Sequence, residues 1–169
     1  DSNMKLIQPL VIIRILSTIL FVETFVFLLC IPVTLLYSES ILPFVWSALI
    51  TLSISMLLFY ISRIAPVRKI SLREGFLSVA LSWLVFSLFG TLPFIFSQTI
   101  PGFADALFES TSGITTTGST VIVNVEVLPY SINFYRCLTH WIGGLGIILL
   151  VIIILPALGI SAHQLLSRE

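Results

Sequence analysis

The stretch that decides the fold of this chain is residues 97–133, which read SQTIPGFADALFESTSGITTTGSTVIVNVEVLPYSIN. After the break at Pro101-Gly102, residues 103–111 have the composition of a short helix. About ten helical residues extend only about 15 Å, which is half the thickness of the hydrocarbon core of a bilayer. The following segment, 112–120, is rich in Thr and Gly and poor in helix formers. A half-length helix followed by an irregular Thr/Gly segment is typical of a loop that enters a membrane and returns to the same side.

The composition of the whole chain places it in a membrane. Of its 169 residues, 57% are hydrophobic and only 9% are charged, whereas about a quarter of the residues in a typical soluble domain are charged. The eight basic and eight acidic residues balance to a net charge of zero, so no overall field attracts nucleic acid. We therefore exclude a cytosolic enzyme, a nucleic-acid binder and a disordered tail.

Four apolar segments, at about 10–36, 41–61, 75–96 and 134–160, are long enough to cross a bilayer, which takes roughly 20 residues. Six basic residues lie on one side of these segments and only Arg136 lies on the other. The six are Lys5, Arg63, Arg68, Lys69, Arg73 and Arg168. Because basic residues favour the cytoplasmic side, we expect a multi-pass protein of the cell inner (plasma) membrane, with both chain ends in the cytoplasm.

Composition alone leaves two interpretations of residues 97–133 open. The first is a re-entrant pore loop, and the second is an ordinary outer loop in which Thr and Gly merely mark turns. Irregular backbone is tolerated at membrane depth only where it is buried in protein or lines water. A pore loop therefore needs partners beyond this one segment.

The run Thr115-Thr116-Thr117-Gly118 has the composition expected of an ion filter. A potassium ion that leaves water needs oxygen atoms in place of its hydration shell, and a ring of backbone carbonyls provides them. Successive carbonyls point the same way only if the backbone leaves helix and sheet geometry, and glycine permits the positive φ values involved. A helix that ends just before such a segment directs the negative end of its dipole toward the ion.

From about residue 73 onward, the chain resembles one membrane–pore–membrane repeat of the Trk/Ktr/HKT superfamily of potassium transporters, and within it the bacterial Trk branch. The motifs that carry the resemblance are EGF at 74–76, GTLPF at 90–94, FESTSGITTTGST at 108–120, FYR at 134–136, HWIGGLG at 140–146 and LPALG at 155–159. The two segments ahead of the repeat are similar to the extra helix pair that Trk-type subunits carry.

This resemblance implies an all-α membrane protein with four transmembrane helices, one re-entrant pore helix at about 103–113 and a filter loop at 114–120. It divides the chain into an auxiliary helix pair with a basic cytoplasmic loop, 1–72, and the repeat itself, 73–169. One repeat forms one quarter of a pseudo-fourfold cation channel. Because these residues contain a single repeat, we expect the remaining repeats to come from the same longer chain, from a split gene product or from other copies.

The resemblance also assigns the ion site. Gly118 matches the filter glycine, and K+ is expected at the backbone carbonyls of Thr116 and Thr117. Thr115 and Ser119 are possible additional filter residues. No other metal and no cofactor is expected.

Three further residues are expected to support the filter, namely Glu109, Gly143 and Gly144. The carboxyl group of Glu109, on the pore helix, is expected to brace the filter backbone; the alternatives are a polar residue at the outer mouth and a buried, protonated acid. The glycines allow the last span to approach the pore helix closely, because small residues permit contact between backbones. Glu23, deep in the first span, requires either protonation or a partner on another helix.

The function implied by the resemblance is potassium uptake through a channel-like filter, without enzymatic activity. The implied partners are a second copy of the complete subunit, a cytosolic nucleotide-binding regulatory subunit and the lipid bilayer. The alternative is a non-conducting membrane scaffold or assembly subunit with an ordinary outer loop.

Overall fold

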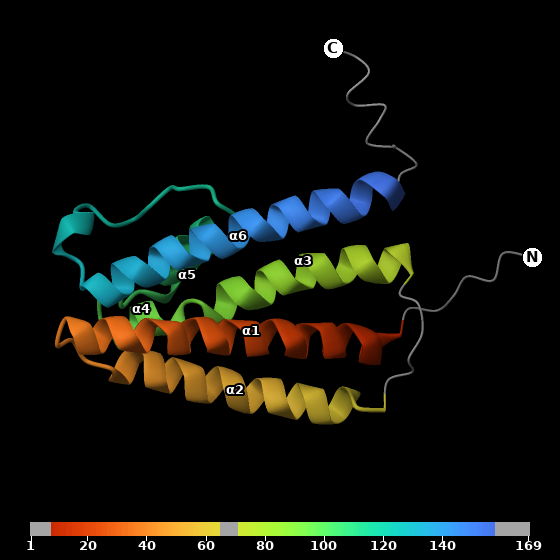
Figure 1. Cartoon of the computed structure of the whole chain (residues 1–169), viewed down its shortest axis with the longest axis horizontal. Helices are drawn as coiled ribbons and strands as arrows, with labels where there is room; N and C mark the ends of the chain where they lie inside the picture. Colours follow the sequence, from red (N-terminus) through yellow and green to blue (C-terminus); the bar gives the residue numbers. More distant parts are fainter. Residues whose placement is uncertain (1–7, 65–70, 158–169) are drawn as a thin grey trace, which may run out of the picture.

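The computed structural model describes residues 8–64 and 71–157, and every regular element in these two ranges is a helix. The elements are α1 (Pro9–Leu36), α2 (Leu42–Ser62), α3 (Leu72–Phe89), α4 (Leu92–Phe96), α5 (Phe103–Ile114), the short 3-10 helix η1 (Val125–Val127) and α6 (Tyr130–Ala157). The long helices lie side by side, and α1 packs against α2, α3 and α6 (Figure 1). Of the predicted features, residues 158–160 of the last span and the basic residues Lys5, Arg68, Lys69 and Arg168 lie outside the described residues.

Three helical segments of the described part are long and apolar enough to cross a membrane. They are Pro9–Leu36, Leu42–Ser62 and Arg73–Phe96, with mean hydropathies of 2.5, 2.0 and 2.0. The first two agree with the predicted segments at 10–36 and 41–61 to within one residue at each end. Helix α6 has 28 residues and begins four residues before the predicted start at 134.

The segment predicted as one helix at about 75–96 is divided into α3 and α4 at Gly90. Pro93 has no N–H group to continue the helical hydrogen bonds, so the helix ends before it. Gly90 also lies so close to α5 that a β-carbon at this position would collide with the hydroxyl of Ser110. The hydroxyl of Tyr135 donates to the Gly90 carbonyl at 3.0 Å. The interruption therefore lets α5 and α6 approach the chain at this point.

Tyr135 of α6 is the centre of the apolar core. Its side chain is fully buried. Its ring centroid lies 5.7 Å from that of Phe27 in α1, 6.1 Å from that of Phe44 in α2 and 5.4 Å from that of Phe94 in α4. Aromatic pairs at such distances are stabilising beyond their buried area. One side chain thus holds α1 and α2 against the helices of residues 73–157.

Glu23 lies within α1 and is fully buried. Neither of its carboxyl oxygens has a hydrogen-bond partner in the described part of the chain. Within the described residues, therefore, no group on another helix forms a hydrogen bond with Glu23, so the paired form considered from the sequence is not found there. A buried carboxyl group without a partner is far less costly in its neutral form than as an anion.

Candidate functional site

Helix α5 is too short to cross a bilayer. Its 12 residues extend about 18 Å at 1.5 Å per residue. It packs against α3 and α6, and Figure 1 shows it alongside α6. Its bounds, Phe103–Ile114, differ by one residue from those of the pore helix expected at about 103–113.

The C-terminal end of α5 imposes an unusual backbone on Thr116. The N–H of Thr116 donates to the carbonyl of Gly113, and that of Thr117 donates to the carbonyl of Ser112, both at 3.0 Å. This is the hydrogen-bond pattern of a Schellman motif, which places one residue in the left-handed region. That residue is usually glycine, but here it is Thr116, with φ of +58°. A β-branched residue in this conformation stores strain of about 1–3 kcal/mol.

A second positive φ, +78°, follows at Gly118. Residues Thr116 to Gly118 are exposed. Within the described ranges, no hydrogen bond from the chain reaches the carbonyls of Thr116, Thr117 or Gly118. These carbonyl oxygens are therefore available to a ligand.

The flanking carbonyls are already used by the chain itself. The carbonyl of Thr115 accepts from the hydroxyl of Thr116 at 2.7 Å. The carbonyl of Ser119 accepts from the hydroxyl of Ser112 at 2.5 Å. Thr115 and Ser119 therefore differ from the three residues between them, whose carbonyls accept no hydrogen bond from the described part of the chain.

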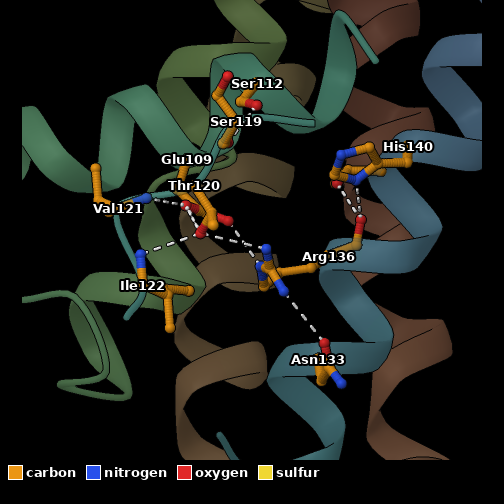
Figure 2. A network of polar contacts seen from close by, with 10 residues as sticks. Glu109, Ser112, Ser119, Thr120, Val121, Ile122, Asn133, Arg136 and His140 are labelled. Atoms are coloured by element: carbon orange, nitrogen blue, oxygen red, sulfur yellow. Dashed lines mark hydrogen bonds and ion pairs between the residues drawn. The ribbon is translucent and has the colours of Figure 1, made fainter. Parts of the chain in front are cut away.

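The chain that leaves this segment returns along α5 and is held by Glu109 (Figure 2). One carboxyl oxygen of Glu109 accepts from the hydroxyl of Thr120 at 2.8 Å and from the N–H of Val121 at 3.2 Å. The hydroxyl of Thr120 also accepts from the N–H of Ile122 at 3.0 Å. The carboxyl group of Glu109 therefore fixes the backbone just beyond Ser119.

The other carboxyl oxygen of Glu109 binds Arg136 of α6, with 2.7 Å between Nε and Oε1 (Figure 2). The side chains of Arg136 and Glu109 are only 13% and 2% exposed. The guanidinium group also donates to the hydroxyl of Thr120 at 3.4 Å and to the amide oxygen of Asn133 at 3.3 Å. The role of Arg136 was not predicted from the sequence. The available signal was that Arg136 is the only lysine or arginine between Arg73 and Arg168.

Two glycines let α5 and α6 approach each other closely. A β-carbon on Gly143 would collide with the backbone carbonyl of Ile114, and one on Gly113 would lie 2.5 Å from the hydroxyl oxygen of Thr139. Gly144 has more room, because the nearest atom to a β-carbon there is Cγ2 of Thr116 at 3.9 Å. Gly143 is therefore the glycine that permits the contact at the end of α5, while Gly144 faces the strained residue Thr116.

Nothing in the described part of the chain resembles a metal centre built from side chains. No group of three or more His, Cys, Asp or Glu side chains in residues 8–64 and 71–157 is placed to hold a metal ion. Nδ1 of His140 lies 2.8 Å from the carbonyl of Arg136, one turn earlier in α6. The carbonyls of residues 116–118, in contrast, accept no hydrogen bond from the described residues.

Comparison with known proteins identifies the family of this chain. The profile of TrkH, described as a cation transport protein, matches residues 44–169, well over half of the chain. This chain belongs to the TrkH family. The finding confirms the resemblance to Trk-type pore subunits, and the family consists of transporters rather than enzymes.

Several members of the TrkH family are similar in sequence to this chain. The Trk system potassium uptake protein TrkH of Escherichia coli (strain K12) is 52% identical over 99 residues, which cover 57% of this chain and 20% of that protein. The protein of the same name from Vibrio parahaemolyticus is 40% identical over 161 residues, 94% of this chain and 33% of that protein. The chain thus spans a fifth to a third of the length of these relatives.

A solved structure agrees with the fold. The crystal structure of the potassium transporter TrkH from Vibrio parahaemolyticus matches with a TM-score of 0.83 at 40% sequence identity, over 91% of this chain and 33% of that one. Together with the apolar helices, this match shows that the chain is an all-helical membrane protein of the TrkH family.

Proposed function

We propose that this chain contributes one filter segment to a potassium uptake protein, as the amino-terminal part of a Trk-type pore subunit. The observation that carries the proposal is the run of three exposed residues, Thr116, Thr117 and Gly118, whose carbonyls accept no hydrogen bond from the described part of the chain. Backbone carbonyls of this kind replace the hydration shell of potassium in ion filters. The names of the relatives, potassium uptake proteins of the Trk system, support the same ion.

The local backbone suits a cation. The C-terminal end of α5 lies next to Thr116, so the negative end of the helix dipole favours positive charge there. Positive φ values at Thr116 and Gly118, on either side of Thr117, rotate neighbouring peptide groups away from helix and strand geometry. We assign K+ to the carbonyls of Thr116 and Thr117 and the turn to Gly118, with Thr115 and Ser119 as flanking residues.

The surroundings of the filter segment are suited to keeping its oxygens in place. The carboxyl group of Glu109 and the guanidinium group of Arg136 hold the outgoing backbone at Thr120 and Val121. Oxygens that are fixed before the ion arrives discriminate better than oxygens that must be ordered at binding. The close approach at Gly143 supports the start of the segment in the same way.

The proposed arrangement in the membrane follows from the helix lengths. Helices α1, α2, α3–α4 and α6 would cross the bilayer, and α5 with residues 115–120 would enter and return on the outer side. Residues 1–72 would form the auxiliary pair, and 73–169 one quarter of a pseudo-fourfold pore. Arg63 follows the last residue of α2, and Arg73 lies in the first turn of α3. Figure 1 shows the end of α2 and the start of α3 at the end of the bundle opposite the α1–α2 connection, and basic residues there support cytoplasmic chain ends. Three further repeats, a second copy of the subunit and a cytosolic nucleotide-binding regulator would complete the assembly.

The test is a pair of glycine substitutions in the complete protein that contains this chain, purified and placed in vesicles. Gly118→Ala puts a β-carbon on a residue with φ of +78°, whereas Gly75→Ala adds one where no atom lies within 4 Å. We expect Gly118→Ala to lower the ratio of potassium to sodium uptake and Gly75→Ala to leave it unchanged. An unchanged ratio in Gly118→Ala, with normal protein yield, would indicate a loop without a role in conduction.

A further inference from the structure

The connection between α1 and α2 begins with a backbone turn of fixed geometry. Helix α1 ends, like α5, in a Schellman motif. The N–H of Ser38 donates to the carbonyl of Leu35 at 3.3 Å, and that of Glu39 donates to the carbonyl of Thr34 at 2.8 Å. Ser38 adopts the left-handed φ of +54° that the motif requires. The backbone of Glu39 is therefore held in a defined position at the end of α1.

Helix α6 begins without a cap of its own. Its N-cap position is Pro129, whose carbonyl accepts from the N–H of Asn133 at 3.0 Å. Proline has no side-chain acceptor for the free N–H groups of the first turn. Glu39 provides that acceptor: Oε1 binds the N–H of Tyr130 at 2.7 Å, and Oε2 binds the N–H and the hydroxyl of Ser131 at 3.0 and 2.5 Å. The negative charge also suits the positive end of the helix dipole.

A ring contact reinforces this junction. The rings of Tyr37 and Tyr130 are stacked, with centroids 4.2 Å apart and planes at 16°. We call Tyr37, Glu39, Tyr130 and Ser131 the clasp. It joins residues about 90 positions apart in the sequence, and it connects the α1–α2 pair to the helix that carries Arg136.

Helix α6 links the clasp to the filter segment. Arg136 follows Tyr130 by six residues, or about 9 Å along the helix axis. Its guanidinium group holds Glu109 at 2.7 Å and Thr120 at 3.4 Å. Fewer than two turns of helix separate the two sites, so the position and rotation of the first turn determine where the guanidinium group lies. The core contacts of Tyr135 fix the lateral position of α6, and the clasp fixes the N-terminal end of this helix.

We propose that Glu39 is a positioning residue of the ion filter: from the auxiliary helix pair, it sets the placement of α6 at which Arg136 holds Glu109 and the outgoing filter backbone. The proposal rests on the proposed function, because the property it affects is discrimination between potassium and sodium. It assigns the α1–α2 pair a part in selectivity, although none of its residues lies in the filter segment.

If Glu39 only stabilised α6 as an N-cap, any other N-cap would replace it. A substitution at Pro129 separates this stabilising role from the proposed positioning role. Serine is among the best N-cap residues. In the double variant Glu39→Ala/Pro129→Ser, the first turn of α6 regains a local acceptor but loses its bond to the α1–α2 connection. Such a variant recovers the stability of α6 without the clasp.

The experiment uses the complete protein in vesicles, with thermal stability and the potassium-to-sodium uptake ratio measured for each variant. We expect Glu39→Ala to lower both, with a loss of roughly three- to tenfold in the ratio, which lies within the range of coupling energies measured along packed networks. Glu39→Ala/Pro129→Ser should recover stability but not the ratio. Glu126→Ala, at an exposed acid in η1, is the charge-matched control and should change neither.

Two results would overturn the proposal: a normal ratio in Glu39→Ala, or recovery of both properties in the double variant. The wild type and Gly118→Ala are measured alongside. If Gly118→Ala alters the ratio and Glu39→Ala does not, only the role of Glu39 is wrong. If Gly118→Ala has no effect either, the proposed function itself is wrong.

Discussion

The ion pair between Arg136 and Glu109 offers the most quantitative test of the site. The two charged groups are 2.7 Å apart, and their side chains are 13% and 2% exposed. Exposed pairs contribute at most about 1 kcal/mol, but removing one partner of a buried pair costs about 3–5 kcal/mol, because the other charge stays buried alone. We expect Arg136→Met to destabilise the protein by an amount in this higher range.

Removing both charges should be less harmful than removing one. In Glu109→Gln/Arg136→Met no buried charge is left unpaired, so the double variant should be more stable than Arg136→Met alone. The assay is the unfolding of the complete purified protein, compared across the wild type, both single variants and the double variant. Both Arg136 variants should also discriminate less well between potassium and sodium. If the losses of the two single variants simply add in the double variant, the buried pair does not exist as described.

Three further predictions concern other residues. Gly143→Ala should destabilise the protein by about 1–3 kcal/mol, because the added carbon collides with the Ile114 carbonyl, while Gly144→Ala should be tolerated; equal losses in unfolding assays would contradict this. Glu23→Gln should leave thermal stability nearly unchanged, because a neutral amide replaces an acid without a partner, whereas a large loss would point to an unseen cation. Burial alone raises the pKa of Glu39, but hydrogen bonds from the Ser131 hydroxyl and the N–H groups of Ser131 and Tyr130 outweigh it and hold the pKa below its usual 4.5. The stability that Glu39 contributes should therefore be complete above pH 4.5 and be lost as the pH falls through the lowered pKa, so wild type and Glu39→Gln should converge in acid.

The sequence was sufficient for the first two long helices and for the half-length helix. Helices α1 and α2 lie within one residue of their predicted bounds, because each is a long, predominantly apolar run between polar connections, and Arg14 and Glu23 are the only charged residues in them. Helix α5 was recognised from the Pro101-Gly102 break before it and the Thr/Gly segment after it. Such elements are determined by local composition, so a single sequence reveals them.

The features that were missed depend on contacts between distant residues. The interruption at Gly90 reflects Pro93 together with the approach of Ser110, which only the packing of α5 reveals. The partner of Glu109 lies 27 positions further on, and the cap of α6 comes from Glu39 because Pro129 cannot provide it. Left-handed Thr116 was also unforeseen, since threonine disfavours that region and only the bonds at the end of α5 impose it.

The central claim is that the carbonyl oxygens of Thr116 and Thr117 take the place of water around a potassium ion. The most direct measurement is the structure of the complete protein in a bilayer-like environment with thallium, a heavy substitute for potassium whose anomalous scattering locates it. We predict a thallium peak in direct contact with both carbonyls. A segment 115–120 that lies outside the membrane with its carbonyls bound to water, and no peak beside it, would contradict the claim.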